Sequence, residues 1–289
     1  MQDTAVDKSK ALVSVVVVTY NHHDTIARCL DSILEQKTDF LFEVLVADDA
    51  STDGTSDIVR EYAQRDCRIV PCIREKNMGF VRNITLALKS VRSDFFMVTE
   101  GDDYWCDCEK LRCQIDALTC HPDCSCCGHA VDARDALGNH LYYIARKIHG
   151  DAALFDFESA PSCHMTSVLM RNFLPSLSDR EWAHMSGDGW YLFIALDKGK
   201  MVYLDRIMSV YNVTGQGVWS SLSNDQKEAI YQLGSYEMDQ FFHFKHTKMF
   251  QPRYLPGNPK TLLTITIPLW RGRKLMFKIQ KSKPRKAWC

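Results

Sequence analysis

Residues 95–105 read Phe-Phe-Met-Val-Thr-Glu-Gly-Asp-Asp-Tyr-Trp, and the rest of the chain is interpreted around this stretch. Its apolar first half is typical of a buried strand, and it ends abruptly in three carboxylates, Glu100, Asp102 and Asp103. Like charges packed together raise one another's pKa, so a divalent cation would best supply the missing positive charge. Oxygen ligands favour Mg²⁺ or Mn²⁺. A solvated acidic turn that caps the next helix is the alternative.

Three more apolar runs precede this stretch, and each is followed by apolar residues at helical spacing. We expect strands at residues 12–18, 42–47, 69–73 and 94–99, with a helix between each pair. Strands that alternate with helices indicate an α/β protein with a parallel sheet. Such sheets bind their ligands at the carboxyl ends of the strands.

Polar clusters follow the ends of these predicted strands. They are Thr19-Tyr20-Asn21, Asp48-Asp49, Asn77-Met78-Gly79 and Glu100 to Asp103. Because parallel strands end at one edge of the sheet, a single cleft should collect them. Neither Gly-x-Gly-x-x-Gly nor Gly-x-x-x-x-Gly-Lys-Ser/Thr is present, so acidic residues and a metal are expected to handle a diphosphate.

Composition and charge set the class of the protein. With 289 residues, 46% of them hydrophobic and 25% charged, the chain is typical of a soluble globular protein. No apolar run reaches the roughly 18 residues of a membrane span, and the polar N-terminus is unlike a signal peptide, so a cytoplasmic location is expected. Residues 241–289 hold 12 Lys and Arg and no acidic residue, which leaves 23 basic against 36 acidic residues in positions 1–240.

This basic, aromatic tail favours peripheral binding to an anionic membrane surface, on the inner face of the cell membrane. A terminal helix packed on the body is the alternative. Nucleic-acid binding is not expected, because no recognition motif accompanies the tail and the body is acidic.

The twelve cysteines are expected to stay reduced. Seven of them lie in residues 106–127. Without paired Cys-x-x-Cys motifs, small buried side chains on a helix and the following strand are favoured over a zinc site.

The four clusters occur as Val-Thr-Tyr-Asn, Val-Ala-Asp-Asp-Ala-Ser-Thr-Asp-Gly-Thr, Asn-x-Gly and Glu-Gly-Asp-Asp-Tyr-Trp. In this order they resemble glycosyltransferase family 2, which comprises inverting, nucleotide-sugar-dependent enzymes. The resemblance covers about four fifths of the chain. It implies a GT-A fold, a Rossmann-like and mostly parallel central sheet flanked by helices, with a helical C-terminal extension. The implied domains are a catalytic domain of residues 1–222, with a nucleotide-binding half at about 10–105 and an acceptor half at about 106–222, and an extension of residues 223–289.

The resemblance also implies roles for individual residues. Asp188, between two glycines, takes the place of the catalytic base, although alone it reads as a helix N-cap. Asp103 and Asp102 would hold Mg²⁺ or Mn²⁺. The donor nucleotide would contact Thr19, Tyr20, Asn21, Asp48, Asp49, Asn77, Gly79 and Asp102. The donor sugar or acceptor would contact Glu100, His164, Thr166, Trp190 and Trp219, with a structural role as the alternative for His164.

The chain departs from the family pattern after residue 210. Relatives show Tyr-Arg-x-His-Gly there, and Asn212 and Thr214 stand in the places of the arginine and histidine. A ligand nitrogen and a phosphate-facing cation are therefore expected to be missing. Weak or silent nucleotide-sugar binding is one competing function. A nucleotidyltransferase is another, although such enzymes usually carry a Gly-rich basic loop near the N-terminus.

The expected reaction moves a sugar from a nucleoside-diphosphate sugar to an acceptor hydroxyl with inversion. Uridine is favoured because a carboxylate can accept from its ring N–H, although guanosine offers one too. The acceptor would be a carbohydrate or lipid-linked molecule in cell-surface polysaccharide or glycolipid assembly.

Patterns in the second half predict the remaining elements. We expect helices at residues 108–119 and 223–244, a strand at 124–131 and a strand pair at 200–210. A hairpin over the cleft is expected within 134–162, with its turn at 137–139, and residues 162–171 should cross back into the sheet.

Overall fold

The computed structural model describes residues 10–184, 188–213, 222–254, 264–269 and 273–278. The chain forms two compact units, residues 1–214 and 215–289. The division into domains at residue 222 stays a prediction.

The first unit is built on one sheet with strand order β3-β2-β1-β4-β9-β6-β10-β5. Its first four strands in sequence are β1 (Val13–Thr19), β2 (Phe42–Asp48), β3 (Ile69–Pro71) and β4 (Phe95–Glu100), which pair in parallel. They confirm the four expected strands to within two residues at each end. Val15 and Val16 of β1 point to opposite faces, and both are fully buried. The sheet is therefore covered on both faces, which explains the unbroken apolar run of β1.

The second half of the sheet is mixed. The segment that was expected to cross back does so as β9 (Leu169–Arg171), which is antiparallel to both β4 and β6 (Cys124–Asp135). The strand β10 (Lys200–Val213) runs parallel to β6 along its whole length. The expectation of a strand pair at 200–210 is therefore wrong. Register shifts between Leu204 and Ser209 mark β-bulges, where an irregular pattern resembles a break although pairing continues.

Three short strands complete this sheet. They are β5 (Tyr104–Trp105) and β8 (Ala152–Phe155), both antiparallel to β10, and β7 (His140–Ile144), antiparallel to β6. The turn between β6 and β7 contains Gly138 at φ 84°, so the expected turn at residues 137–139 is confirmed.

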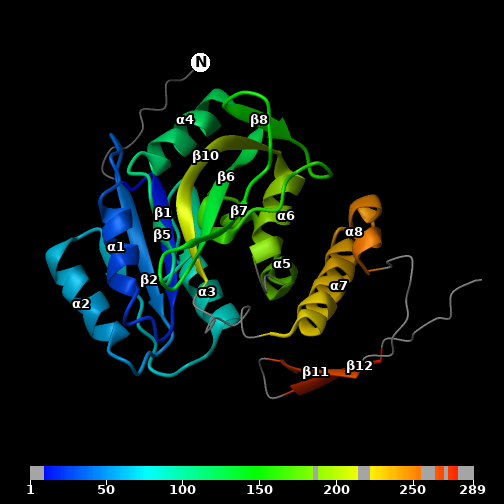
Figure 1. Cartoon of the computed structure of the whole chain (residues 1–289), viewed down its shortest axis with the longest axis horizontal. Coiled ribbons are helices and arrows are strands. Elements are labelled where there is room, and N and C mark those ends of the chain that lie inside the picture. The colour runs from blue at the N-terminus through cyan, green and yellow to red at the C-terminus, as the bar shows by residue number, and fades with distance from the viewer. Residues whose placement is uncertain (1–9, 185–187, 214–221, 255–263, 270–272, 279–289) are drawn as a thin grey trace, which may run out of the picture. The chain divides into compact units, whose positions relative to one another are not determined.

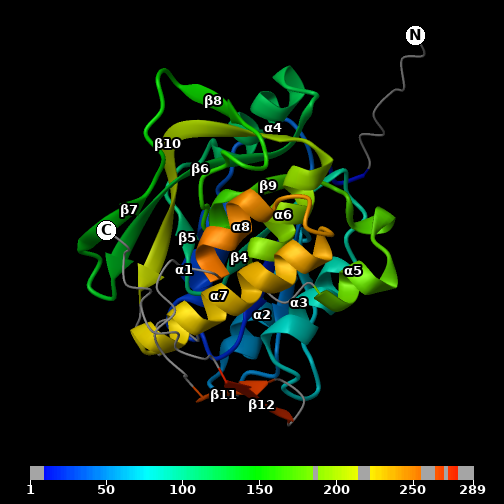
Figure 2. The same cartoon turned by 90° about the vertical axis from the view of Figure 1, so that its right-hand side faces the viewer.

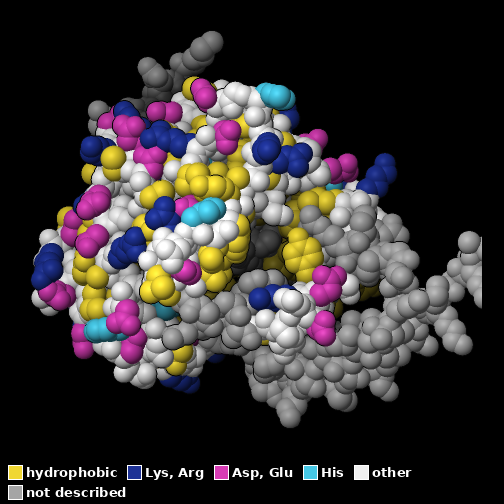
Figure 3. Space-filling model, in the orientation of Figure 1, with side chains coloured by type: hydrophobic (Ala, Val, Ile, Leu, Met, Phe, Trp, Pro, Cys, Tyr) yellow, Lys and Arg dark blue, Asp and Glu magenta, His cyan; other side chains and the backbone are white. Residues whose placement is uncertain are grey.

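Helices cover both faces of this sheet (Figure 1). They are α1 (Ile26–Leu34), α2 (Thr55–Arg65), α3 (Phe80–Leu88), α4 (Lys110–Cys120), α5 (Asp179–His184) and α6 (Asp188–Lys198), with short 3₁₀ helices η1 (Met165–Ser167) and η2 (Leu174–Ser176). One core cluster joins α1, α2 and α4 to β1, through residues such as Leu30, Val59, Leu111 and Val15. On the face seen in Figure 3, side chains of both charges are interspersed among hydrophobic ones.

The cysteine-rich segment follows the favoured interpretation in part. Cys124, Cys126 and Cys127 are buried in β6, whereas Cys106 and Cys120 are exposed. Within the described residues, no group of His, Cys, Asp or Glu with metal-binding geometry includes a cysteine.

The second unit begins with α7 (Asn224–Phe241) and α8 (Thr247–Tyr254), as the expected helical extension requires (Figure 2). Ser223 and Gln226 form a capping box that fixes the start of α7. Two antiparallel strands that the sequence did not indicate follow, β11 (Thr264–Leu269) and β12 (Arg273–Lys278). Among the described residues, no helix combines the length and the hydropathy needed to cross a membrane.

Candidate active site

The ends of β1, β2 and β4 lie at one level of the sheet. Thr19 pairs with Asp48, and Val18 pairs with Glu100. Beyond these pairs, the Gly101 amide donates to the Val18 carbonyl at 2.9 Å, and the Asp49 amide donates to the Thr19 carbonyl at 3.0 Å. The polar residues that follow the three strands therefore share one edge, as the sequence predicted.

Gly101 allows the acidic turn to pack against β1. A Cβ added at this position would lie 2.8 Å from Thr19 Oγ1, 2.9 Å from Thr19 Cβ and 2.9 Å from His22 Nδ1. Such distances are shorter than van der Waals contact. Any other residue between Glu100 and Asp102 would push the carboxylates away from this edge.

Asp48, the last residue of β2, and Asp49 are buried and accept hydrogen bonds from the chain. Asp48 accepts from the Ser51 and Ser56 hydroxyls. Asp49 accepts from the amides of Met78 at 2.8 Å and Gly79 at 2.5 Å, which joins the loop after β2 to the loop before α3. The contacts of Asp49 hold the Asp48-Asp49 cluster against the Asn77-Met78-Gly79 cluster. All these hydrogen bonds use some of the lone pairs with which both carboxylates could bind a ligand.

Asn21 links the loop after β1 to the loop after β2. Its backbone has φ 55°, its amide donates to Ser51 Oγ, and its side-chain oxygen accepts from the Thr52 amide, both at 2.9 Å. The Tyr20 side chain is 44% exposed and the Asn77 side chain is also exposed, so both are accessible to a ligand.

Carboxylate oxygens of Glu100 and Asp103 and a ring nitrogen of His164 all lie within 4.8 Å of one another. Asp103 is 1% exposed and its Oδ1 accepts from the Asn212 amide at 3.0 Å. Its Oδ2 lies 3.6 Å from His164 Nδ1, too far for a hydrogen bond and close enough for both atoms to ligate one cation. Residues from β4, the segment before η1 and β10 therefore converge on one point.

The electrostatics of this point favour a cation. Burial raises the pKa of Asp102, while the neighbouring His22 opposes that rise. Among the described residues, the buried Oδ1 of Asp102 has no hydrogen-bond partner. Burial also lowers the pKa of His164 to about 4, so its ring is neutral at physiological pH, the form that ligates metals.

Other predicted site residues lie elsewhere. Thr166 is fully buried, and its hydroxyl shares hydrogen bonds with Thr99 Oγ1 at 2.7 Å and Trp105 Nε1 at 3.3 Å. Trp190 is 3% exposed within α6. Neither position favours contact with a ligand, and their predicted roles stay predictions. Asp188 begins α6, but its side chain and all of Trp219 lie outside the described part of the chain.

Two residues near the acidic turn were not predicted from the sequence to belong to the site. His22 Nδ1 lies 3.2 Å from Thr19 Oγ1, and His22 opposes the rise in the pKa of Asp102. The Tyr211 ring packs on the His164 ring with centroids 4.4 Å apart. The position of His22 directly after Thr-Tyr-Asn is a usable signal. Nothing in the local sequence brings Tyr211 to His164.

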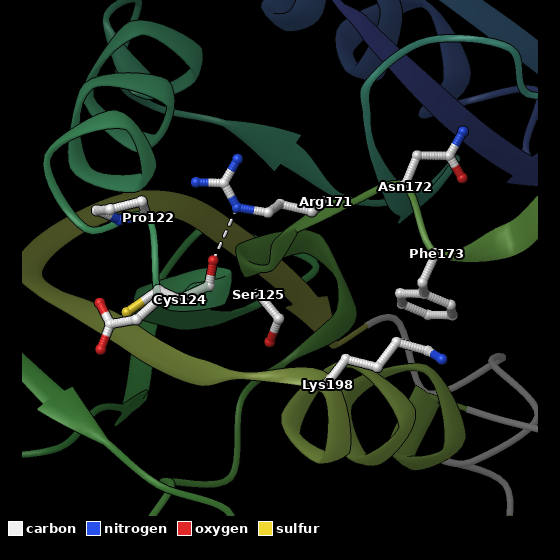
Figure 4. A pocket seen from close by; sticks show the side chains of 8 residues that line it. Pro122, Cys124, Ser125, Arg171, Asn172, Phe173 and Lys198 are labelled. Carbon is white, nitrogen blue, oxygen red and sulfur yellow. Dashed lines mark hydrogen bonds between the residues drawn. The ribbon is translucent and has the colours of Figure 1, made fainter. Parts of the chain in front are cut away.

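A pocket lies at the opposite ends of the parallel strands, where β6 begins (Figure 4). Arg171 in its wall donates from Nε to the Cys124 carbonyl at 2.8 Å and from Nη2 to the Leu118 carbonyl at 2.6 Å. Its guanidinium thus fastens the end of α4 to the start of β6. The hydrogen bonds of Arg171 stabilise the fold, and the pocket is separate from the acidic cluster.

Solved structures identify the fold. The S. aureus TarS fragment 1-349 in complex with UDP-GlcNAc aligns with a TM-score of 0.57 at 20% identity, over 84% of this chain and 78% of that one. The mannosyltransferase PcManGT from Pyrobaculum calidifontis, in complex with GDP-Man and Mn²⁺, gives a TM-score of 0.57 at 17% identity, over 88% and 73%. The first unit therefore has the GT-A glycosyltransferase fold, and this confirms the expected fold class.

The family follows from sequence comparison. The sequence model of the family described as Glycosyl transferase family 2 matches residues 14–174, so the chain belongs to this family. The uncharacterized protein Rv1520 of Mycobacterium tuberculosis is 32% identical over 233 residues, which span 75% of this chain and 63% of the relative. The Escherichia coli UDP-Glc:alpha-D-GlcNAc-diphosphoundecaprenol beta-1,3-glucosyltransferase WfaP is 37% identical over 97 residues, 32% of this chain and 36% of that protein.

Proposed function

We propose that this chain is a metal-dependent, inverting glycosyltransferase that moves a hexose from a nucleoside-diphosphate sugar to an acceptor hydroxyl. The observation that carries the proposal is the convergence of Glu100, Asp103 and His164 within 4.8 Å at the carboxyl edge of the sheet. The cluster would contribute little to stability, because crowded carboxylates, of which Asp103 is buried, repel one another. A cation bound there would neutralise this repulsion and would attract a diphosphate.

The ligand set fits Mg²⁺ or Mn²⁺. Glu100 and Asp103 offer hard oxygens and His164 offers a neutral nitrogen, a mixture that suits Mn²⁺ in particular. The buried Oδ1 of Asp102 lacks a hydrogen-bond partner in the described part of the chain, which a cation or its bound water would supply. When bound, the ion would neutralise charge that develops on the departing diphosphate.

His164 could supply the ligand nitrogen that is missing because Asn212 and Thr214 depart from the family pattern. The sequence suggested that no ligand nitrogen remained, yet His164 presents one from a different segment. The backbone amide of Asn212 is used as well, because it positions Asp103 at 3.0 Å. These two contacts favour an active enzyme over a silent nucleotide-sugar-binding protein.

Different residues would bind the nucleotide base and activate the acceptor. Thr19, Tyr20, Asp48 and Asp49 would line the base site, with a carboxylate lone pair accepting from a ring N–H. Asp188 would accept the proton of the acceptor hydroxyl as that oxygen attacks the anomeric carbon opposite the leaving group. Attack from that face inverts the configuration at this carbon.

We favour a UDP-sugar donor and an acceptor in cell-surface polysaccharide or glycolipid assembly. TarS was solved with UDP-GlcNAc, and WfaP is named for a UDP-Glc donor and a lipid-linked acceptor. A lipid-linked acceptor agrees with the 12 basic residues at positions 241–289, which would attract an anionic membrane surface.

Donor turnover tests this proposal. The purified chain would be mixed with UDP-glucose, UDP-GlcNAc or GDP-mannose, and release of the nucleoside diphosphate measured with Mn²⁺ and with a chelator. We expect slow hydrolysis of one donor that requires the metal. The proposal would be contradicted if the chain bound none of the three donors and released a nucleoside diphosphate from none of them.

A further inference from the structure

A row of residues crosses three neighbouring strands and ends at the acidic cluster. Tyr211 of β10 pairs with Ala133 of β6, and Ala133 pairs with Tyr142 of β7. Cross-strand partners point to the same face of a sheet, so the two tyrosines flank one small residue on one surface. Figure 2 shows β7, β6 and β10 side by side.

The inner end of the row lies at the site. The Tyr211 ring packs against His164, whose Nδ1 is 3.6 Å from Asp103 Oδ2. The two registers place Tyr142 two strands away, on the same face of the sheet as this residue that touches the cluster.

The outer end of the row is accessible. Tyr142 is 49% exposed, whereas Ala133, in the middle of the row, is fully buried. A tyrosine exposed beside a polar site offers a ligand both an apolar face and a hydroxyl.

The other face of the hairpin carries a separate set of contacts. Asp132, 4% exposed, accepts hydrogen bonds from His140 Nδ1 and Arg134 Nε, both at 2.6 Å. His140 also stacks on Tyr143, with centroids 4.2 Å apart. Because Tyr143 pairs with Asp132, its side chain points away from the Tyr142 row.

We propose that Tyr142, at the outer end of the Tyr142–Ala133–Tyr211 row, is a subsite for the saccharide part of the acceptor. The inference rests on the proposed function, since it assigns a binding surface for the second substrate of that reaction. The apolar face of a pyranose ring packs on the exposed Tyr142 ring, and its hydroxyls reach the phenol and the polar site. A sugar held there extends inward past Tyr211 toward the cluster, where the donor sugar is expected.

Two variants separate this role from a general effect of the hairpin. Tyr142→Ala removes the proposed platform, and Tyr143→Ala removes a ring of similar exposure, 56%, from the opposite face. Cellotetraose, chitotetraose and mannotetraose serve as probes, because each offers several pyranose faces without charge. Binding would be measured by saturation-transfer NMR and calorimetry in the presence of Mn²⁺ and UDP.

We expect at least one tetrasaccharide to bind the wild type and Tyr142→Ala to weaken it about three- to tenfold, as loss of one aromatic contact predicts. Tyr143→Ala should bind it as the wild type does, and both variants should keep Mn²⁺-dependent binding of UDP-GlcNAc. Equal effects of the two variants would overturn the inference. So would loss of vesicle binding in Tyr142→Ala with no change in saccharide binding. A wild type that binds donor but no tetrasaccharide overturns this inference alone, whereas one that binds no donor overturns the proposed function.

Discussion

Replacing Gly101 by alanine should deform the acidic turn and destabilise the protein. The new Cβ would meet Thr19 Oγ1 at 2.8 Å and Thr19 Cβ at 2.9 Å. Thr19 Cβ is attached to the backbone of β1, which pairs with β2 and β4 and cannot retreat alone. The turn must therefore move, at a cost of about 1–3 kcal/mol for an overpacked site.

Urea denaturation of the wild type and Gly101→Ala would measure that cost, and calorimetry would measure Mn²⁺ affinity. Because the turn carries Asp102 and Asp103, we expect metal affinity to fall together with stability. Gly234→Ala is the control. Its Cβ meets nothing within 4 Å in α7, so it should stabilise the protein by about 1 kcal/mol and leave metal binding unchanged.

The two readouts together decide the outcome. A Gly101→Ala protein with wild-type stability and wild-type metal affinity would refute the argument that close packing against β1 positions the carboxylates. Lost stability with unchanged metal affinity would show that the turn does not hold the ion.

Three further predictions concern other parts of the chain. Asp188→Asn should keep donor affinity and lose about 10² or more in turnover, measured by product formation, and a change of only a few-fold would place the base elsewhere. Lys110 is fully buried, and burial holds its pKa well below the usual range, so the unfolded chain binds more protons than the folded chain at pH values between the folded and the unfolded pKa of this amine. Lys110→Met should therefore be more stable than the wild type at pH 7 by urea denaturation, with the difference shrinking as pH rises toward about 10.4, and an unchanged difference would contradict this. The control Lys37→Met, at an exposed position, should show no such trend. Removing residues 255–289, which hold nine Lys and Arg and no acidic residue, should abolish sedimentation with anionic vesicles and keep donor binding, whereas vesicle binding by the shortened chain would exclude the tail as the membrane contact.

Much of the first unit could be predicted because its signals are local. The β-branched run of β1 and the apolar run of β4 must be buried strands whatever surrounds them. The polar residues after those strands then share an edge as a consequence of parallel pairing. Glu100 and Asp103 were placed at the site by this reasoning, and the structure brings them together.

What could not be predicted depends on distant pairing. His164 reaches Asp103 across 61 positions of sequence because β9 inserts antiparallel between β4 and β6. The contact of Tyr211 with His164 likewise depends on where β10 runs. The bulges of β10 interrupt its pattern, so the sequence indicated two strands in place of one. A sequence pattern with period two carries no information about which strands become neighbours.

Mn²⁺ binding by Asp103→Asn tests most directly whether Glu100, Asp103 and His164 hold a metal ion. The amide keeps an oxygen that accepts from the Asn212 amide, so the fold should persist while the ligand charge is lost. Asp57→Asn removes an exposed carboxylate as a control, whose side chain is 83% exposed. Electron paramagnetic resonance would count free Mn²⁺ with and without UDP-GlcNAc. The account predicts tight, donor-enhanced binding in the wild type and Asp57→Asn, and its loss in a folded Asp103→Asn. Equal Mn²⁺ binding in all three proteins would contradict it.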